Sequence, residues 1–187
     1  ISRADVEFNT GWVANYPRIR QASEARARER KKRSQGRYDG WEITLDDIFE
    51  EMRLTYALSQ NQLDWLKAKE VELEIECVEP ISTGISLVQD SLRSGHQVIL
   101  ISDMYLPKEI IKAMLCRAHP SLVELPLFLS SEEKHQKSNG GMYAHILDRL
   151  PFMHSTWVHV GDNKHADHKV PKSLGIQSIL VPTWSRN

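Results

Sequence analysis

The chain has 187 residues, of which 41% are apolar and 26% are charged, as in an ordinary globular domain. Its formal net charge is −1, which gives no overall basic field, so we expect no nucleic-acid partner. No apolar run approaches the roughly 18 residues of a membrane helix, and the first ten residues, ISRADVEFNT, lack the pattern of a signal peptide. With only two cysteines, Cys77 and Cys116, this composition predicts a cytoplasmic protein with packed thiols and no membrane partner.

Residues 1–79 are predicted to form a helical, highly charged region. Thr44-Leu-Asp-Asp47 and Ser59-Gln-Asn-Gln62 resemble capping boxes, which predict helices that begin near residues 45 and 60. The expected buried faces are listed here: Leu45, Ile48, Phe49, Met52 and Tyr56 on one helix, and Leu63, Leu66, Leu73 and Cys77 on the next.

The basic run from Arg26 to Arg33 allows two interpretations. It is either a solvated helix face paired with acidic neighbours or a patch that attracts phosphate or nucleic acid. Glu70 lies within an apolar stripe, where a carboxylate needs a partner such as an arginine of the first helix.

Residues 80–187 are predicted to form a second region, in which short apolar strands alternate with helices. A helix capped by Ser82 and ended by Gly95 comes first, with Ile85, Val88 and Leu92 as its apolar side chains. The expected strands are residues 97–101, 126–129, 156–160 and 177–181, with helices after Pro107 and from Gly141 to Leu150. This order predicts an α/β fold with a parallel sheet and helices on both faces.

Polar side chains follow three of the expected strands. Ser102 and Asp103 follow the first strand, Lys137 follows the second, and Asp162 and Asp167 follow the third. The carboxyl ends of parallel strands meet at one edge, where function gathers in such sheets. A hydroxyl and an ammonium group suit phosphoryl oxygens, and carboxylates suit Mg²⁺.

The three motifs together resemble those of a known superfamily. VILIS102DMYL, then SSEEKHQK137SNGGMY, then HVGD162NKHAD167 are similar to the second, third and fourth motifs of the haloacid dehalogenase (HAD) superfamily of phosphatases. The combination of SDMYL with HVGDN resembles the motifs of HAD-type hydrolases that act with, or are fused to, glycosyltransferases of surface-polysaccharide synthesis. The resemblance covers residues 80–187, and residues 1–79 resemble the helical cap that such enzymes insert.

The resemblance implies a HAD-like Rossmannoid fold and a phosphoryl transfer through an aspartyl-phosphate on a phosphorylated small molecule. It assigns catalysis to Ser102, Lys137 and Asp162, phosphate binding to Ser102, Asp103 and Lys137, and Mg²⁺ binding to Asp162 and Asp167. For Asp167 it also leaves the roles of capping a helix or orienting Lys137. The nucleophile belongs to a first motif, Asp-x-Asp, that this sequence does not contain. The nearest candidate, Asp5-Val-Glu7-Phe-Asn9-Thr10, has Glu in place of the second Asp.

Three functional hypotheses follow. The first is a fragment of a Mg²⁺-dependent phosphohydrolase that lacks its nucleophile, and the second is a non-catalytic HAD-like module for binding or scaffolding. The third is a zinc site at His159, His165 and His168. In the family, the leading strand lies between the strands that end at Ser102 and Gly161. This sequence lacks that strand, and we call its place between the two strands the lane. We therefore expect another segment in the lane, direct pairing of these two strands, or an empty lane.

Overall fold

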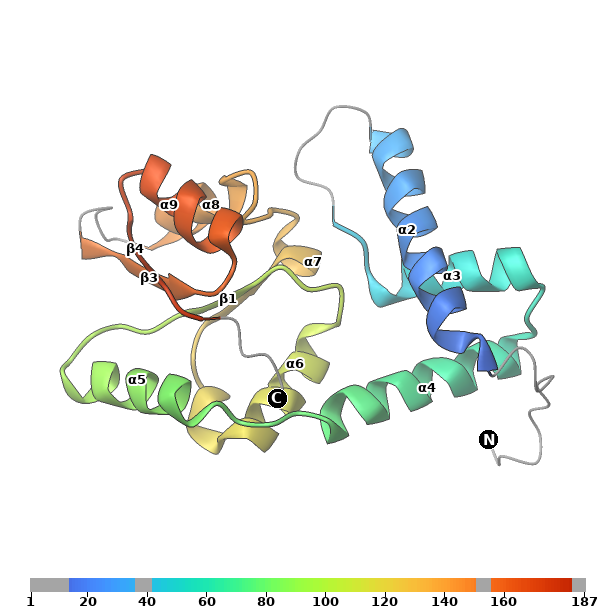
Figure 1. The fold of residues 1–187 in the computed structure, drawn as a ribbon, viewed down its shortest axis with the longest axis horizontal. Helices are drawn as coiled ribbons and strands as arrows, with labels where there is room; N and C mark the ends of the chain where they lie inside the picture. Colours follow the sequence, from blue (N-terminus) through green and yellow to red (C-terminus); the bar gives the residue numbers. More distant parts are fainter. Residues whose placement is uncertain (1–13, 36–41, 151–155, 183–187) are drawn as a thin grey trace.

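The computed structural model of the chain describes residues 14–35, 42–150 and 156–182 (Figure 1). It begins with three helices, which are α2 (Tyr16–Gln35), α3 (Leu45–Tyr56) and α4 (Gln60–Glu76). Within these ranges no helix has the length and apolar character that crossing a bilayer requires.

Both predicted capping boxes are present. The Thr44 hydroxyl accepts the Asp47 backbone N–H at 3.2 Å, and the Asp47 carboxylate accepts the Thr44 N–H at 2.9 Å. Ser59 and Gln62 form the same reciprocal pair at the start of α4. These caps satisfy N–H groups that a helix start leaves without partners, so both helices begin where the sequence predicts.

The basic run of α2 is paired with acidic side chains, as the first interpretation predicted. Its ion pairs are Arg28 with Glu24 and Glu42, Arg30 with Glu51, Lys31 with Asp47, and Arg33 with Glu29. Glu51 and Asp47 belong to α3, so opposite charges face each other across the two helices. Of these pairs, Arg33 with Glu29 is well exposed on both sides and contributes little to stability, about 0–1 kcal/mol.

Glu70 has the arginine partner that its position requires. Arg20 on α2 binds the Glu70 carboxylate at 2.8 Å, and the Tyr16 hydroxyl donates a hydrogen bond to it at 2.8 Å. The Arg20 guanidinium also lies over the Tyr105 ring, 5.1 Å from its centre. The pair therefore links α2 to α4 and to the loop that follows the first strand.

Short strands and helices alternate in the remainder of the chain (Figure 1). In order they are α5 (Ser82–Arg93), β1 (Leu100–Ser102), α6 (Lys108–Ala118), a 3₁₀ turn η2 (Pro120–Leu122), β2 (Leu127–Leu129), α7 (Ser130–Glu133), α8 (Gly141–Arg149), β3 (Val158–Gly161), a π-helical segment η4 (Lys164–Lys169), α9 (Val170–Ser173) and β4 (Gln177–Leu180). The four strands lie where the apolar runs predict them. The short elements η2, α7, η4 and α9 were not predicted.

The strands form two parallel pairs. Strand β1 pairs with β2, with Ser102 opposite Leu129, and β3 pairs with β4, with Gly161 opposite Leu180. No described strand joins the pairs, and β1 does not pair with β3. The single predicted sheet is therefore replaced by two two-stranded sheets. Of the three expectations for the central lane, direct pairing was wrong, and no described strand occupies the lane.

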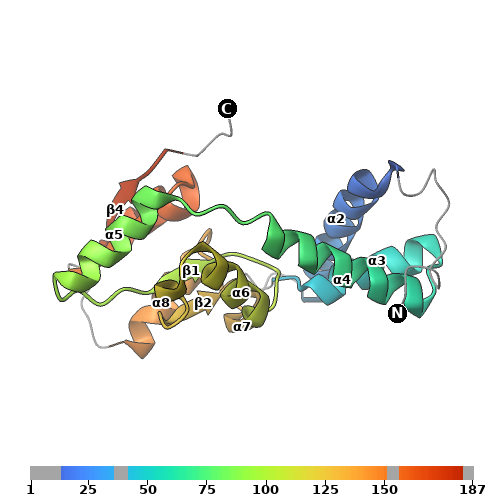
Figure 2. The same cartoon turned by 90° about the horizontal axis from the view of Figure 1, so that it is seen from below.

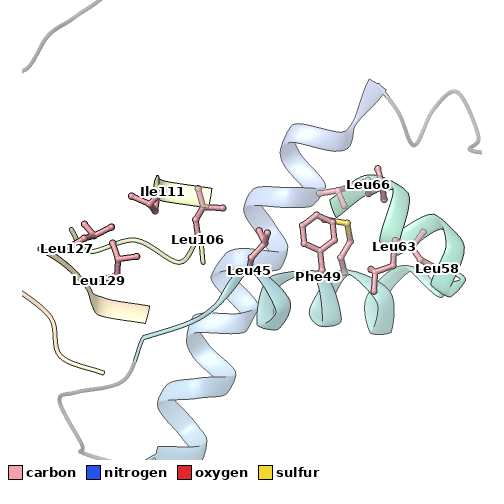
Figure 3. Packing of buried hydrophobic residues seen from close by; sticks show 11 residues of the cluster. Leu45, Phe49, Leu58, Leu63, Leu66, Leu106, Ile111, Leu127 and Leu129 are labelled. Atoms are coloured by element: carbon pink, nitrogen blue, oxygen red, sulfur yellow. The ribbon is translucent and has the colours of Figure 1, made fainter. Parts of the chain in front are cut away.

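Two apolar clusters lie on opposite faces of β1 and β2. Cluster 1 packs Leu45, Phe49, Leu63 and Leu66 of the first helices with Leu106, Ile111, Leu127 and Leu129 (Figure 3). Cluster 2 packs Phe128 with Met142, Tyr143 and Ile146 of α8, with Trp157 and with Ile176. Alternate residues of a strand point to opposite faces, which explains why Phe128 and its two neighbours belong to different clusters.

Several predicted core residues are not buried. Helix α5 has no buried residue, and Figures 1 and 2 show it joined to α4 by an extended segment at the edge of the molecule. Of its predicted apolar side chains, Ile85 and Val88 are half-buried and Leu92 is exposed. In α4, Leu73 is exposed and so is Cys77, because the C-terminal half of the helix extends beyond α3. Cys116 is also exposed, so the prediction of two packed thiols was wrong.

One predicted cap is also absent. The Ser82 hydroxyl does not cap α5, because the helix begins at Ser82 itself and Ile81 occupies the N-cap position without a side-chain hydrogen bond. Gly95 does lie just beyond the helix end, with a φ of 78°. This left-handed conformation carries little cost for glycine, which explains the residue type at that position.

Candidate functional site

The predicted site residues follow the ends of β1, β2 and β3, and hydrogen bonds bring Asp103, Lys137 and Asp167 together. Ser102 is the last residue of β1, and Asp103 follows it. Lys137 lies in the loop between α7 and α8, and Asp162 follows β3. Hydrogen bonds of Lys137 join these loops, as described next.

Lys137 is held by both its backbone and its side chain. Its backbone N–H donates to the two carboxylate oxygens of Asp103, at 3.0 and 3.1 Å. Its Nζ lies 2.6 Å from Oδ1 of Asp167, and the side chain is only 13% exposed. An ammonium group has three N–H donors, so two remain for another acceptor. The loops after β1 and β3 thus meet at Lys137.

Asp167 is the buried anchor of this arrangement. Its Oδ1 accepts hydrogen bonds from Lys137 and from His159 Nε2 at 3.0 Å, and its Oδ2 accepts the Asn163 N–H at 3.0 Å. Burial raises the pKa of Asp167, but the hydrogen bonds from His159 and Lys137 outweigh burial and hold the pKa well below its ordinary value. Asp167 is therefore a carboxylate at neutral pH. These contacts favour the role of orienting Lys137, and direct metal binding by Asp167 stays a prediction.

His159 is buried inside β3 and completes the support of Asp167. Its ring lies edge-on to Tyr143 of α8, with centres 5.2 Å apart. The Tyr143 hydroxyl donates to the backbone oxygen of Ala166 at 2.6 Å, which fixes the start of η4 beside the same strand. The orientation of Asp167 is therefore set by strand, helix and loop together.

Gly161 leaves room for Asp167 at the end of β3. A Cβ atom at this position would lie 2.5 Å from Asp167 Cγ, closer than real Cβ atoms approach. Glycine is thus required here by the close approach of the carboxylate.

We expect Gly161→Ala to lower the free energy of unfolding by about 1–3 kcal/mol, because the new methyl group must displace a buried, fully bonded carboxylate. Urea unfolding measures the effect. Gly84→Ala in α5 is the matched control, since its Cβ would meet Ile81 at an ordinary 3.9 Å. Equal stability of the two variants would contradict the steric reading of Gly161.

Asp162 and Ser102 remain available for a ligand. Asp162 is exposed, and no hydrogen bond or ion pair joins its carboxylate to another described residue. The Ser102 hydroxyl is half-buried and likewise has no hydrogen-bond partner in the described part of the chain. Among the described residues, the site thus offers the Asp162 carboxylate after β3 and the Ser102 hydroxyl at the end of β1 to a ligand.

Asp103 binds the backbone of Lys137, and its surroundings shift the pKa of its carboxyl group in opposite directions. Loss of hydration raises its pKa, and the charges of Glu42 and Asp167 add to this effect. The Lys137 N–H and ammonium group lower the same pKa. The observed role of Asp103 is the hydrogen bond that it accepts from the Lys137 backbone. Its contact with phosphate stays a prediction.

The predicted zinc ligands point to different partners. His159 binds Asp167, His165 Nε2 lies 3.0 Å from the Ser138 carbonyl oxygen, and His168 Nδ1 lies 3.0 Å from the Ser178 hydroxyl. In the described residues no cluster of three or more histidine, cysteine, aspartate or glutamate side chains is arranged to hold a metal ion. The zinc hypothesis was therefore wrong for these histidines. The candidate first motif, residues 5–10, lies outside the described residues.

The sequence named His159 only as a zinc ligand, and its support of Asp167 was missed. His159 sits in a strand whose other residues are apolar, and this pattern is the signal that could have identified its buried role. Glu42 was missed altogether. Glu42 is buried next to the loops of Asp103 and Lys137, and nothing in the local sequence distinguishes it from other acids of the charged region.

Comparisons with known proteins give the fold. No family model matches the sequence, and no curated protein matches it. Among solved structures, the chain is similar to YfnB from Bacillus subtilis, described as a HAD-hydrolase bound to magnesium. The TM-score is 0.56 and the sequence identity 18%, over 94% of this chain and 72% of that chain. The chain has a HAD-like fold. At this identity the likeness concerns the HAD-like fold and carries no activity with it.

Proposed function

We propose that this chain supplies the phosphate- and metal-supporting part of a HAD-type phosphohydrolase that acts on a phosphorylated small molecule. The observation that carries the proposal is the fixed position of Lys137, whose backbone N–H binds Asp103 after β1 and whose ammonium group binds Asp167 after β3. A buried cation with unused N–H donors at the carboxyl ends of parallel strands is suited to bind phosphoryl oxygens.

The residues present fit a magnesium ion in part. Asp162 has a carboxylate without a protein partner, whereas both oxygens of Asp167 already accept hydrogen bonds. Mg²⁺ is usually held by one or two carboxylates and several waters, so Asp162 would be its ligand from this chain. When bound, the ion would offset the negative charge of the phosphoryl group. YfnB, which has a similar fold, is described as bound to magnesium, and this is the reason for proposing magnesium as the ion.

The nucleophile would come from a strand in the lane between β1 and β3. Neighbouring strands are about 4.8 Å apart, so one strand fits between two that are separated by twice that spacing. Each has an edge that no described strand pairs with. A strand that ends in Asp-x-Asp would place its carboxylates between Ser102 and Asp162, beside Lys137. In this proposal, α2, α3 and α4 form the cap that determines the substrate. The proposed partner is a glycosyltransferase of polysaccharide synthesis, and the proposed location is the cytoplasm.

The alternative is a HAD-like binding or scaffolding module without catalysis. It is favoured by the lack of an Asp-x-Asp motif in the sequence and of a described strand in the lane. The two proposals differ in whether a chain that also carries such a strand turns over phosphate esters.

We expect this chain alone, with Mg²⁺ and p-nitrophenyl phosphate, to show no turnover above background, because the sequence has no Asp-x-Asp motif to supply the carboxylate that accepts the phosphoryl group. The assay is repeated on a chain extended by its own upstream coding sequence. Turnover by the extended chain supports the phosphohydrolase. A folded extended chain that carries Asp-x-Asp and is inactive towards a panel of phosphate monoesters supports the binding module. Turnover by the present chain that Asp5→Asn abolishes would place the first motif at residues 5–10.

A further inference from the structure

Glu42 is a buried carboxylate at the junction between the N-terminal helices and the candidate site. Its residue is 3% exposed, and it lies three positions before α3 begins. The segment that carries it is bound to the loop after β1, because the Leu45 N–H donates to the Tyr105 carbonyl oxygen at 3.0 Å. Glu42 therefore belongs to the helical region in sequence and contacts the site loops in space.

Four donors surround the Glu42 carboxylate. Oε1 accepts from Arg28 of α2 at 3.0 Å and from its neighbour, the Ile43 N–H, at 2.9 Å. Oε2 accepts from the Ser130 hydroxyl at 3.0 Å and from Gln136 Nε2 at 3.2 Å. One oxygen thus binds the helical region, and the other binds the two ends of the segment that leads from β2 to Lys137.

These bonds form a closed ring with the contact between Asp103 and Lys137. The Ser130 hydroxyl accepts the Met104 N–H at 3.0 Å, and Met104 follows Asp103. Gln136 precedes Lys137, whose N–H binds Asp103. The ring therefore runs from Glu42 through Ser130 and Met104 to Asp103, and returns through Lys137 and Gln136.

We propose that Glu42 is a positioning residue that transmits the placement of helix α2 to the Asp103–Lys137 contact. A charge at this depth is tolerated only while its donors surround it, so loss of Arg28 leaves the carboxylate with the Ile43 N–H, Ser130 and Gln136 and with no counter-charge among these contacts. Hydrogen bonds in such a network strengthen one another, so a change at one end alters the others. The inference rests on the proposed function only for the catalytic meaning of Lys137, because the ring itself is made of contacts in the fold.

The matched variants are Glu42→Gln and Glu51→Gln. Both glutamates are buried and both pair with an arginine of α2. Glu51 pairs with Arg30, and among the described residues no hydrogen bond or ion pair joins it to the site loops. An amide has one acceptor oxygen and one N–H₂ group, so glutamine at position 42 must turn N–H₂ towards a donor. Arg28→Gln is the third variant, because it removes the ion pair between α2 and Glu42 and keeps the Glu42 carboxylate.

The readout is NMR of the backbone amides, which needs no catalysis and so separates this inference from the proposed function. With Glu42→Gln, we expect the Met104 amide to exchange with solvent about ten-fold faster or more, and the Lys137 amide signal to shift. With Arg28→Gln, the same two signals should move in the same direction by a smaller amount, and with Glu51→Gln they should stay in place.

Each other outcome overturns a named part of the inference. If Glu42→Gln leaves both amides unchanged, or if Glu51→Gln moves them equally, Glu42 has no specific effect on the site. If Glu42→Gln moves them and Arg28→Gln does not, Glu42 supports the loops locally and transmits nothing from α2.

Discussion

Replacement of Asp167 by asparagine is expected to lower the free energy of unfolding by about 3–5 kcal/mol at neutral pH, the usual cost of removing one partner of a buried ion pair. Lys137 would keep its charge at 13% exposure without a counter-charge, and His159 would share an amide oxygen or face an N–H₂ group. Urea unfolding at constant pH measures the loss. Asp90→Asn is the control, because its pair with Arg93 is exposed on both sides and should be worth about 0–1 kcal/mol.

The double variant Asp167→Asn with Lys137→Gln tests the cause of that loss. If the unpaired ammonium group is responsible, removing its charge should restore part of the stability, and the two effects should not add. Additive losses would show that the Asp167 contribution comes from its bonds to His159 and Asn163 instead.

The contribution of Asp167 should also depend on pH in a defined direction. Its pKa is lower in the folded chain than its ordinary value of 3.8, so the folded state holds this carboxylate charged more strongly than the unfolded state does. The contribution is complete above the unfolded pKa and is lost as the pH falls through about 3.8 towards the folded pKa. The difference in stability between the native chain and Asp167→Asn should therefore shrink in acid and stay constant from about pH 5 upward.

Replacement of Lys137 by alanine, or of Asp162 by asparagine, is expected to reduce phosphoryl transfer by about 10²-fold or more in an active chain that contains the nucleophile strand. Lys137 would lose its electrostatic contact with the transferred group, and Asp162 its charge towards magnesium. The measurement is kcat/KM for the best phosphate ester at saturating Mg²⁺. Asp162→Asn is the cleaner variant, because the exposed carboxylate has no described partner whose loss would alter the fold.

Asp103→Asn provides the comparison for these two variants. Its carboxylate binds the Lys137 backbone, and an asparagine oxygen can still accept that N–H, so the loss of rate should be smaller. Equal losses at all three positions would show that Asp103 has a direct chemical role. Circular dichroism of each variant separates a loss of rate from a loss of fold.

The helix starts and strand positions could be predicted because they depend on local chemistry. Thr44 and Ser59 bond to residues three places along the chain, and the apolar runs that become β2 and β3 are short and sharply bounded. The pairing of Arg20 with Glu70 was also accessible, because a carboxylate within an apolar stripe needs a counter-charge. Such features require no knowledge of the distant fold.

The remaining features depend on contacts between distant segments. The burial of Glu42 follows from Ser130, which is 88 positions away, and local sequence carries no sign of that contact. The exposure of α5 was missed because amphipathic spacing shows which face prefers burial, but not whether a neighbour is there to bury it. The order of the site motifs predicted that Lys137 and Asp167 meet, whereas the bond of His159 to the same oxygen required the structure.

The two-sided packing of β1 and β2 has a consequence for cooperativity. Leu127 and Leu129 belong to cluster 1 with the first helices, and Phe128 between them belongs to cluster 2 with α8. Unfolding of either cluster would expose one face of the strand Leu127–Leu129 to solvent. The helical layer and α8 both pack on this strand, so we expect their thermal unfolding to be coupled through it. Their enthalpies of unfolding therefore belong to one transition, as in a small protein that unfolds in two states.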